Sequence, residues 1–296
     1  MYAPIIKEEN NTGSLAETRG NVLGMPRFAA NLTTMFQELP FPDRFRAARE
    51  CGFTAVEILS PYRYDINVLS NWLVQSDLEA ILINISPGGA GETGTAAIPG
   101  REAFFRSSFQ NALDYATGMG ASMIHVLAGR ETEQTRLSEG LFIDNLRWAA
   151  DLAAPRGVSL LLEPLNTQDV AGYLHTRSDH TAELIHTLDR DNIKMQFDFY
   201  HMQIMEGNLA AGLKRHLDII GHVQFSSLPG RNEPQYGEVN IHLLADYLDE
   251  LGYAGWVGCE YAAKAGTIEG LDWGKRYGLG KMLPGNESSS QSESSI

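Results

Sequence analysis

Four oxygen-bearing side chains stand at or next to the ends of four apolar segments in the second half of the chain. They are Glu163, Asp198, Gln224 and Glu260, with successive spacings of 35, 26 and 36 residues. Carboxylate and amide oxygens are preferred ligands of hard divalent cations such as Mg²⁺ and Mn²⁺. If the four segments are neighbouring parallel strands of a barrel, their carboxyl ends converge on one face. The spacing then predicts one bound divalent metal, Mg²⁺ or Mn²⁺, held by these four residues.

A simpler interpretation exists for each of these residues taken alone. A single acidic residue after a strand usually caps the next helix. Four such ends in consecutive units favour a shared site, because a carboxylate in the dry mouth of a barrel is costly unless it is paired or bound to a metal.

The elements that must position these side chains alternate along the chain. Segments of strand length and composition are 27–32, 54–59, 79–84, 122–127, 158–163, 193–198, 220–225 and 255–260. Segments with helical spacing of apolar residues are 42–51, 65–77, 101–118, 136–155, 177–189, 206–217 and 240–251, with a weaker one at 268–277. This alternation predicts one α/β domain, a (β/α)₈ TIM barrel over residues 25–280. A doubly wound open sheet is the alternative, because alternation alone does not show closure.

Composition narrows the classes of partner. The chain has 296 residues and a net charge of −14, a field that repels phosphate backbones and predicts no nucleic-acid partner. It has no apolar run of about 18 residues, so we expect no membrane span. Two cysteines, Cys51 and Cys259, and a polar start without a signal-like segment are typical of a cytoplasmic protein. Residues 1–24 and the serine-rich 281–296 are expected to be disordered tails. Assembly as a homo-oligomer is left open.

Several stretches resemble one enzyme family. LLLEPLN (160–166), MQFDFYHMQIMEG (195–207), GHVQFSSLPGRNEPQYGEVN (221–240) and GWVGCEY (255–261) resemble hydroxypyruvate isomerases, which belong to the xylose-isomerase-like TIM barrel superfamily. The resemblance begins near Met25, continues in collinear order through GFTAVEILSPY (52–62) and IPGRE (98–102), and ends near Tyr277.

The resemblance implies a reaction and its residues. The metal ligands would be the four residues named above, and Glu163 and Glu260 would also be catalytic, moving a proton between adjacent carbons through an enediol. The leading prediction is an isomerase converting hydroxypyruvate to tartronate semialdehyde. A 2-oxo-tetronate isomerase and a ketose 3-epimerase are alternatives on the same site. An AP-endonuclease-like repair enzyme, which would need a histidine-rich metal cluster and a basic groove, and a catalytically idle binding barrel are less favoured.

Four further residues are predicted to bind the substrate, a small hydroxy-oxo acid or short sugar. His201 lies in a D-x-x-H pattern, where the resemblance to sugar epimerases implies contact with a substrate oxygen. Arg231 suits a substrate carboxylate because a guanidinium binds carboxylates with two parallel hydrogen bonds. Tyr62 and Asn84 follow or end the second and third strands. Three of the four have an ordinary alternative: a core or capping histidine, a solvated loop arginine, and packing for the tyrosine.

Other noticeable residues are given supporting roles or none. Asn31 and Glu57 are expected to face the same mouth, and Glu206 and Glu238 to be loop or supporting residues. His125 and His222 receive no role, and Cys259 should face away from the site because it neighbours Glu260 on a strand.

The loop after the third strand candidate contains a formal G-x-G-x-x-G at Gly89, Gly91 and Gly94. A dinucleotide-binding loop should open a helix at once, and Pro99 and Gly100 argue against that. We interpret it as a flexible substrate loop, and its departure from the family's common form leaves the exact substrate open.

Overall fold

The computed structural model describes residues 25–280, and the two predicted tails, 1–24 and 281–296, lie outside this range. The strands are β1 (Arg27–Asn31), β2 (Ala55–Ile58), β3 (Glu79–Asn84), β4 (Met123–His125), β5 (Ser159–Leu162), β6 (Ile193–Asp198), β7 (Ile220–Phe225) and β8 (Trp256–Cys259). The α-helices are α1 (Phe41–Glu50), α2 (Ile66–Gln75), α3 (Glu102–Met119), α4 (Glu139–Ala153), α5 (Ser178–Leu188), α6 (Phe199–Met205), α7 (Leu209–His216), α8 (Ile241–Glu250) and α9 (Thr267–Gly270). Short 3₁₀ helices span Ala154–Arg156, Pro234–Tyr236 and Leu271–Tyr277.

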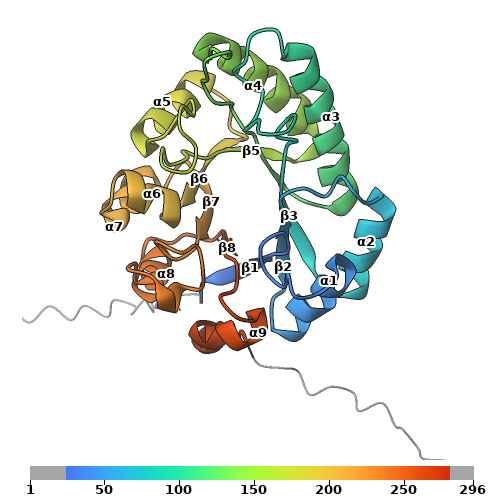
Figure 1. Cartoon of the computed structure of the whole chain (residues 1–296), viewed down its shortest axis with the longest axis vertical. Coiled ribbons are helices and arrows are strands. Elements are labelled where there is room, and N and C mark those ends of the chain that lie inside the picture. The colour runs from blue at the N-terminus through green and yellow to red at the C-terminus, as the bar shows by residue number, and fades with distance from the viewer. Residues whose placement is uncertain (1–24, 281–296) are drawn as a thin grey trace, which may run out of the picture.

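The eight strands are parallel and close into a barrel in chain order. Closure is made by β1 and β8, where Phe28 pairs with Val257 and Ala30 with Cys259. Figure 1 shows the strands around the centre and the helices outside them. The predicted (β/α)₈ TIM barrel is therefore confirmed, and the open doubly wound sheet is wrong because β1 has a partner on each side.

Alternation along the strands separates two kinds of core. Ala29, Ala55, Leu82, Met123 and Leu161 belong to a small apolar cluster within the barrel. A much larger cluster, which includes the residues next to them in sequence, such as Ala30, Ile124 and Leu162, packs between sheet and helices. Because side chains alternate along a strand, residues two positions further along from the inner cluster also point inward. These positions carry the polar residues of the site.

Helix ends follow local rules. Asp65, Ser138 and Asn240 each accept a backbone N–H of the helix they precede, as N-cap residues do. The turn after α4 ends at Gly157 with φ 68°, a left-handed conformation that favours glycine and allows the chain to enter β5. Helix α6, which begins directly after β6, was not predicted, and the predicted 206–217 helix corresponds to α7. Among residues 25–280, no helix is both long and apolar enough to cross a bilayer.

Candidate active site

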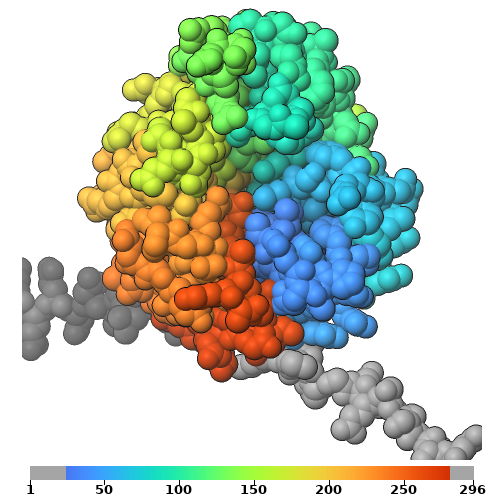
Figure 2. Space-filling model, viewed as in Figure 1, coloured from blue at the N-terminus to red at the C-terminus, as the bar shows by residue number. Residues whose placement is uncertain are grey.

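The four predicted metal ligands are brought to one end of the barrel. Glu163 directly follows β5, Asp198 ends β6, Gln224 is the penultimate residue of β7, and Glu260 directly follows β8. The first three are buried, with at most 4% of their surface exposed, and the side chain of Glu260 is 13% exposed. Figure 2 shows a depression at the centre of this view, between the N-terminal blue segment and the yellow and orange segments.

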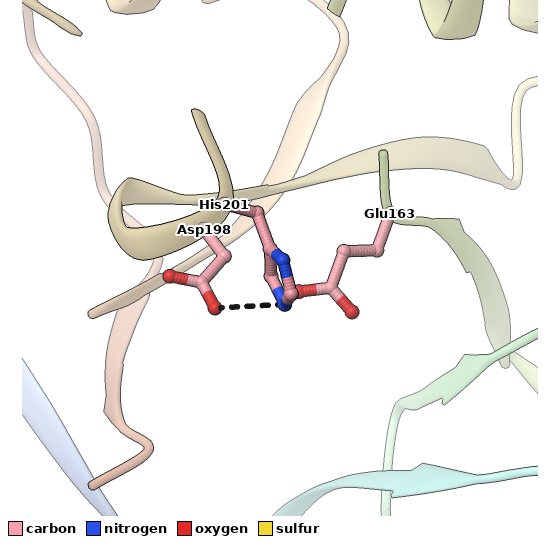
Figure 3. A group of neighbouring side chains, drawn as sticks. All are labelled: Glu163, Asp198 and His201. Carbon is pink, nitrogen blue, oxygen red and sulfur yellow. Dashed lines mark ion pairs between the residues drawn. The ribbon is translucent and has the colours of Figure 1, made fainter. Parts of the chain in front are cut away.

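A close group of possible ligand atoms lies at the ends of β5 and β6. Glu163, Asp198 and His201 each offer an atom within 4.8 Å of the others (Figure 3). Asp198 Oδ1 accepts the N–H of Tyr200 at 2.8 Å and caps α6, whereas its Oδ2 has no hydrogen-bond partner within the described chain. Asp198 is thus a helix cap and keeps a free oxygen for the site.

Two buried carboxylate oxygens indicate which kind of ligand the site would bind. Glu163 Oε1 and Asp198 Oδ2 are both buried and lack a hydrogen-bond donor among the described residues. A buried carboxylate oxygen without a partner is costly, and a cation removes that cost. The donor set, three carboxylates and the amide oxygen of Gln224, suits a hard divalent ion. The residues present therefore fit Mg²⁺ or Mn²⁺.

The pKa shifts of Glu163 and Glu260 also favour a bound cation. Burial is the main cause that raises the pKa of Glu163 well above its ordinary value, and the nearby carboxylates of Asp198 and Glu260 raise it further. Burial likewise raises the pKa of Glu260 to about 8; Arg231 opposes this rise, and Asp198 and Glu57 add to it. A bound cation is favourable beside two carboxyl groups whose pKa values are raised by burial and by neighbouring carboxylates.

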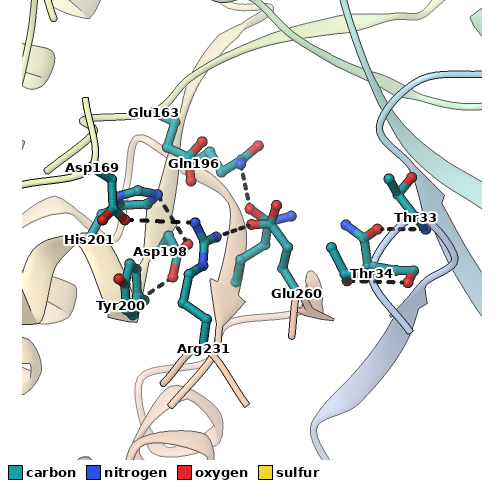
Figure 4. A network of polar contacts seen from close by, with 12 residues as sticks. Thr33, Thr34, Glu163, Asp169, Gln196, Asp198, Tyr200, His201, Arg231 and Glu260 are labelled. Carbon is teal, nitrogen blue, oxygen red and sulfur yellow. Dashed lines mark hydrogen bonds and ion pairs between the residues drawn. The ribbon is translucent and has the colours of Figure 1, made fainter. Parts of the chain in front are cut away.

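Arg231 lies beside the second glutamate. Its guanidinium is 3.4 Å from the Glu260 carboxylate and 3.9 Å from that of Asp169, and it stacks over the ring of Tyr200 at 4.6 Å (Figure 4). Arg231 has φ 50°, and its backbone N–H donates to Ser227 O at 2.7 Å. The predicted carboxylate-binding arginine therefore reaches the mouth of the barrel and is oriented by the loop after β7.

His201, on α6, is buried beside Glu163 and Asp198. Its Nδ1 accepts the backbone N–H of Asn166 at 3.0 Å, and its Nε2 lies 3.8 Å from Asp198 Oδ2. His201 therefore lies next to two of the proposed metal ligands, and its contact with the substrate stays a prediction.

The remaining predicted substrate residues line the side formed by β2 and β3. Tyr62 donates its hydroxyl to the backbone oxygen of Asn84 at 2.5 Å and packs edge-on against Tyr115. The side-chain Oδ1 of Asn84 is buried and has no partner among residues 25–280. Asn84 pairs in register with His125 of β4. Tyr62 thus makes a packing contact, which is the ordinary alternative to substrate binding. The Oδ1 atom of Asn84 remains available as a hydrogen-bond acceptor.

Sequence reasoning missed several residues of this region. The sequence did not indicate which way the side chain of His125 points. Its ring lies in the barrel, with Nδ1 3.5 Å from Glu163 Oε2. Gln196 donates to Gln224 Oε1 at 2.5 Å. The alternation of side chains along a strand could have identified Gln196, because it lies two residues before Asp198 and so faces the same way. Asp169 and Tyr200 carried no comparable signal. Cys259 packs in the outer core, away from the site, as expected.

The glycine-rich loop opens no helix. Helix α3 begins only at Glu102, and Glu92 within the loop forms an ion pair with Arg101. A Cβ on Gly94 would lie 2.2 Å from the backbone oxygen of Leu127, so this glycine is required by a close backbone approach. The loop is anchored at Gly94 against the segment that follows β4 and does not have the form of a dinucleotide site.

Comparison with known proteins gives a consistent result. The family model described as "Xylose isomerase-like TIM barrel" matches residues 45–277. A 2-oxo-tetronate isomerase of Cupriavidus necator is 46% identical over 86% of this chain and 99% of its own length. The hydroxypyruvate isomerase of Escherichia coli is 40% identical over 86% and 100%. A crystal structure described as an AP endonuclease, family 2, from Brucella melitensis superposes with a TM-score of 0.83 at 44% identity over 86% and 99%. The chain therefore belongs to the xylose isomerase-like TIM barrel family, in the group of the hydroxypyruvate and 2-oxo-tetronate isomerases, and is an isomerase.

Proposed function

We propose that the enzyme interconverts a short 2-oxo hydroxy acid and its aldehyde isomer, with hydroxypyruvate and tartronate semialdehyde as the leading pair. The observation that carries the proposal is the combination of two carboxylates, the buried Glu163 and the partly buried Glu260, with the guanidinium of Arg231 next to Glu260. Two carboxyl groups are what a proton shuttle between adjacent carbons needs, and a guanidinium suits the carboxylate of the substrate.

The proton transfers can be assigned to these groups. One glutamate removes a proton from the hydroxymethyl carbon, and the proton of the hydroxymethyl oxygen passes to the neighbouring keto oxygen, which gives an enediolate. The other glutamate then delivers a proton to the former keto carbon, and the hydroxymethyl oxygen becomes the aldehyde oxygen. One carboxyl must begin ionised and the other protonated. The raised pKa values of Glu163 and Glu260 support such a division near neutral pH.

A divalent cation would be held by Glu163, Asp198, Gln224 and Glu260. When bound, it supplies Lewis acidity that polarises the substrate carbonyl and stabilises negative charge on oxygen. His201 and Asn84 would orient the substrate oxygens, since each presents a polar atom to the site. Burial of the surrounding side chains would keep water away from the enediol.

A specific observation favours 2-oxo-tetronate as a second candidate substrate. The C. necator relative that bears that name is more similar to this chain than the E. coli hydroxypyruvate isomerase, at 46% against 40% identity. The two acids share the 2-oxo acid group that Arg231 would bind, and differ by one hydroxylated carbon.

Two other activities have less support. A ketose 3-epimerase acts on a neutral sugar, which offers no carboxylate to the guanidinium of Arg231. A repair endonuclease would require a histidine-rich metal cluster and a basic groove. Within residues 25–280, the potential metal-binding group contains one histidine, and the whole chain carries a net charge of −14.

The test is an NMR assay in D₂O. The chelated protein would be mixed with hydroxypyruvate, 2-oxo-tetronate or a neutral ketose, with and without added Mg²⁺ or Mn²⁺. We expect conversion of a hydroxy-oxo acid, with solvent deuterium at the carbon that is protonated, only when the metal is present. Metal-independent conversion would refute the cation, and conversion of the ketose alone would refute the acid substrate.

A further inference from the structure

A fully buried carboxylate, Glu57 on β2, lies inside the barrel below the proposed metal site and takes no part in the proton transfers. It is 0% exposed and accepts three side-chain hydrogen bonds. His222 Nε2 lies 2.5 Å from its Oε1, and Asn31 and Gln224 donate to its Oε2 at 3.0 and 2.8 Å. The four residues come from β1, β2 and β7, so the network ties strands that are far apart in sequence.

The hydrogen bond to Gln224 determines which atom of that amide faces the site. A carboxylate only accepts, so Glu57 must be contacted by the NH₂ group of Gln224 and not by its oxygen. The amide oxygen is then turned away from Glu57, where it meets the NH₂ group of Gln196 at 2.5 Å. Oxygen is the only atom of a glutamine amide that binds a cation, and it has a second lone pair available.

The absence of a side chain at Gly258 leaves space for the contact between Glu57 and Gln224. A Cβ added at Gly258 of β8 would lie 2.0 Å from Glu57 Oε1 and 2.9 Å from Gln224 Cγ. Any larger residue at this position would displace the carboxylate, the amide, or both. Glycine at 258 is therefore required by the contact between Glu57 and Gln224.

We infer that Glu57 is a positioning residue for the divalent cation: it holds the Gln224 amide with its oxygen toward the mouth of the barrel. This inference rests on the proposed metal-dependent function. It is distinct from a purely structural role, in which Glu57 would only join β1, β2 and β7. A structural role changes the stability of the protein without changing its affinity for a cation.

The experiment measures Mn²⁺ binding by calorimetry on the full chain after chelation, with the melting temperature of each metal-free variant as a check of folding. In Glu57→Gln, residue 57 can present either an NH₂ group or an oxygen to Gln224. It therefore no longer determines which atom of the Gln224 amide faces the site. We expect a dissociation constant about 10–100-fold higher, the range found when residues that orient metal ligands are replaced. Glu233→Gln is the matched control, because Glu233 is also buried and, among residues 25–280, its carboxylate accepts only the backbone N–H of Lys264, outside the site. It should change Mn²⁺ affinity by less than about twofold.

Two more variants separate orientation from charge. Gly258→Ala keeps every charge and displaces Glu57, so it should also weaken Mn²⁺ binding about tenfold or more. The double variant Glu57→Gln/Gln224→Glu exchanges donor and acceptor and again places an oxygen toward the site, so it should recover most of the affinity lost in Glu57→Gln. Wild-type affinity in both folded Glu57→Gln and Gly258→Ala, or no recovery in the double variant, would overturn the inference. Absence of Mn²⁺ binding by the wild type would instead refute the proposed function on which it rests.

Discussion

The Nδ1 atom of His201 accepts the backbone N–H of Asn166, with 3.0 Å between the two nitrogens. An imidazole nitrogen that accepts a hydrogen bond carries no proton, so in the neutral ring the proton is on Nε2. Burial is the main cause that lowers the pKa of His201, against the opposing charge of Asp198, and this favours the neutral ring. Nε2 therefore donates, and a donating nitrogen does not bind a cation. His201 suits a substrate oxygen, although it lies within 4.8 Å of Glu163 and Asp198.

The tautomer leads to a prediction for His201→Ala. The variant loses the Nε2–H donor, and we expect kcat/KM to fall about 10²-fold, as when one donor to a developing oxyanion is removed. Mn²⁺ affinity, measured by calorimetry, should stay within about twofold of the wild type. Asp198→Asn is the comparison, because it should weaken metal binding strongly. Equal loss of Mn²⁺ affinity in the two variants would identify His201 as a metal ligand.

Glu260→Gln tests the proton shuttle. The amide cannot exchange a proton with carbon, so we expect turnover to fall by about 10²–10⁴-fold or more, the usual contribution of general acid–base catalysis. Circular dichroism should show an unchanged fold. The control is Glu238→Gln, which changes an exposed glutamate bonded to Gln203. Near-normal conversion by Glu260→Gln in the D₂O assay would remove Glu260 from the mechanism.

Arg231→Ala tests recognition of the substrate carboxylate. A hydrogen bond to a charged group contributes about 1.5–3 kcal/mol, so the KM for an acid substrate should rise roughly 10–100-fold. The maximal rate should change as well, because Arg231 opposes the rise in the pKa of Glu260. Arg63→Ala, in the loop after β2, is the control because Arg63 is exposed. Unchanged kinetics in Arg231→Ala would exclude this arginine from the substrate site.

A buried histidine that is not one of the proposed metal ligands predicts how stability depends on pH. His175 is 0% exposed, and burial is the main cause that lowers its pKa from 6.5 to about 3. Below pH 6.5 the unfolded chain binds a proton at this residue and the folded chain does not. The stabilisation is therefore complete above pH 6.5 and is lost as the pH falls toward 3, at about 1.4 kcal/mol per pH unit.

The measurement is urea unfolding of the wild type and His175→Asn at pH 7.5 and pH 5.5. Asparagine keeps a donor for the Thr181 hydroxyl, which lies 3.0 Å from His175 Nδ1. The loss of unfolding free energy on acidification should be smaller in the variant by about 1 kcal/mol. His186→Asn, at an exposed site on helix α5, should behave as the wild type. The same pH dependence in wild type and His175→Asn would contradict a neutral buried ring.

The positions of the elements and of the proposed ligands could be read from the sequence because both depend on local patterns. The eight strand predictions each overlap an observed strand, and 79–84, 193–198 and 220–225 match β3, β6 and β7 residue for residue. Apolar runs and helical spacing are properties of a few neighbouring residues. Alternation within a strand also placed Cys259 on the outer side and Glu260 on the inner side. Helix α6 was not predicted, because its seven residues follow β6 without a turn and Asp198 both ends the strand and caps the helix.

Only the tertiary structure decided which inward-facing residues meet. Closure of the barrel depends on the register of all strand pairs together, which no local pattern contains. His222 and Glu57 are 165 residues apart and lie in contact inside the closed barrel, and Arg231 reaches both Asp169 and Glu260 from a separate loop. The proton of His201 is likewise set by a backbone N–H 35 residues away. Sequence determined the types and the faces of these side chains. Their partners were decided by closure, because it brings distant strand ends within hydrogen-bonding distance.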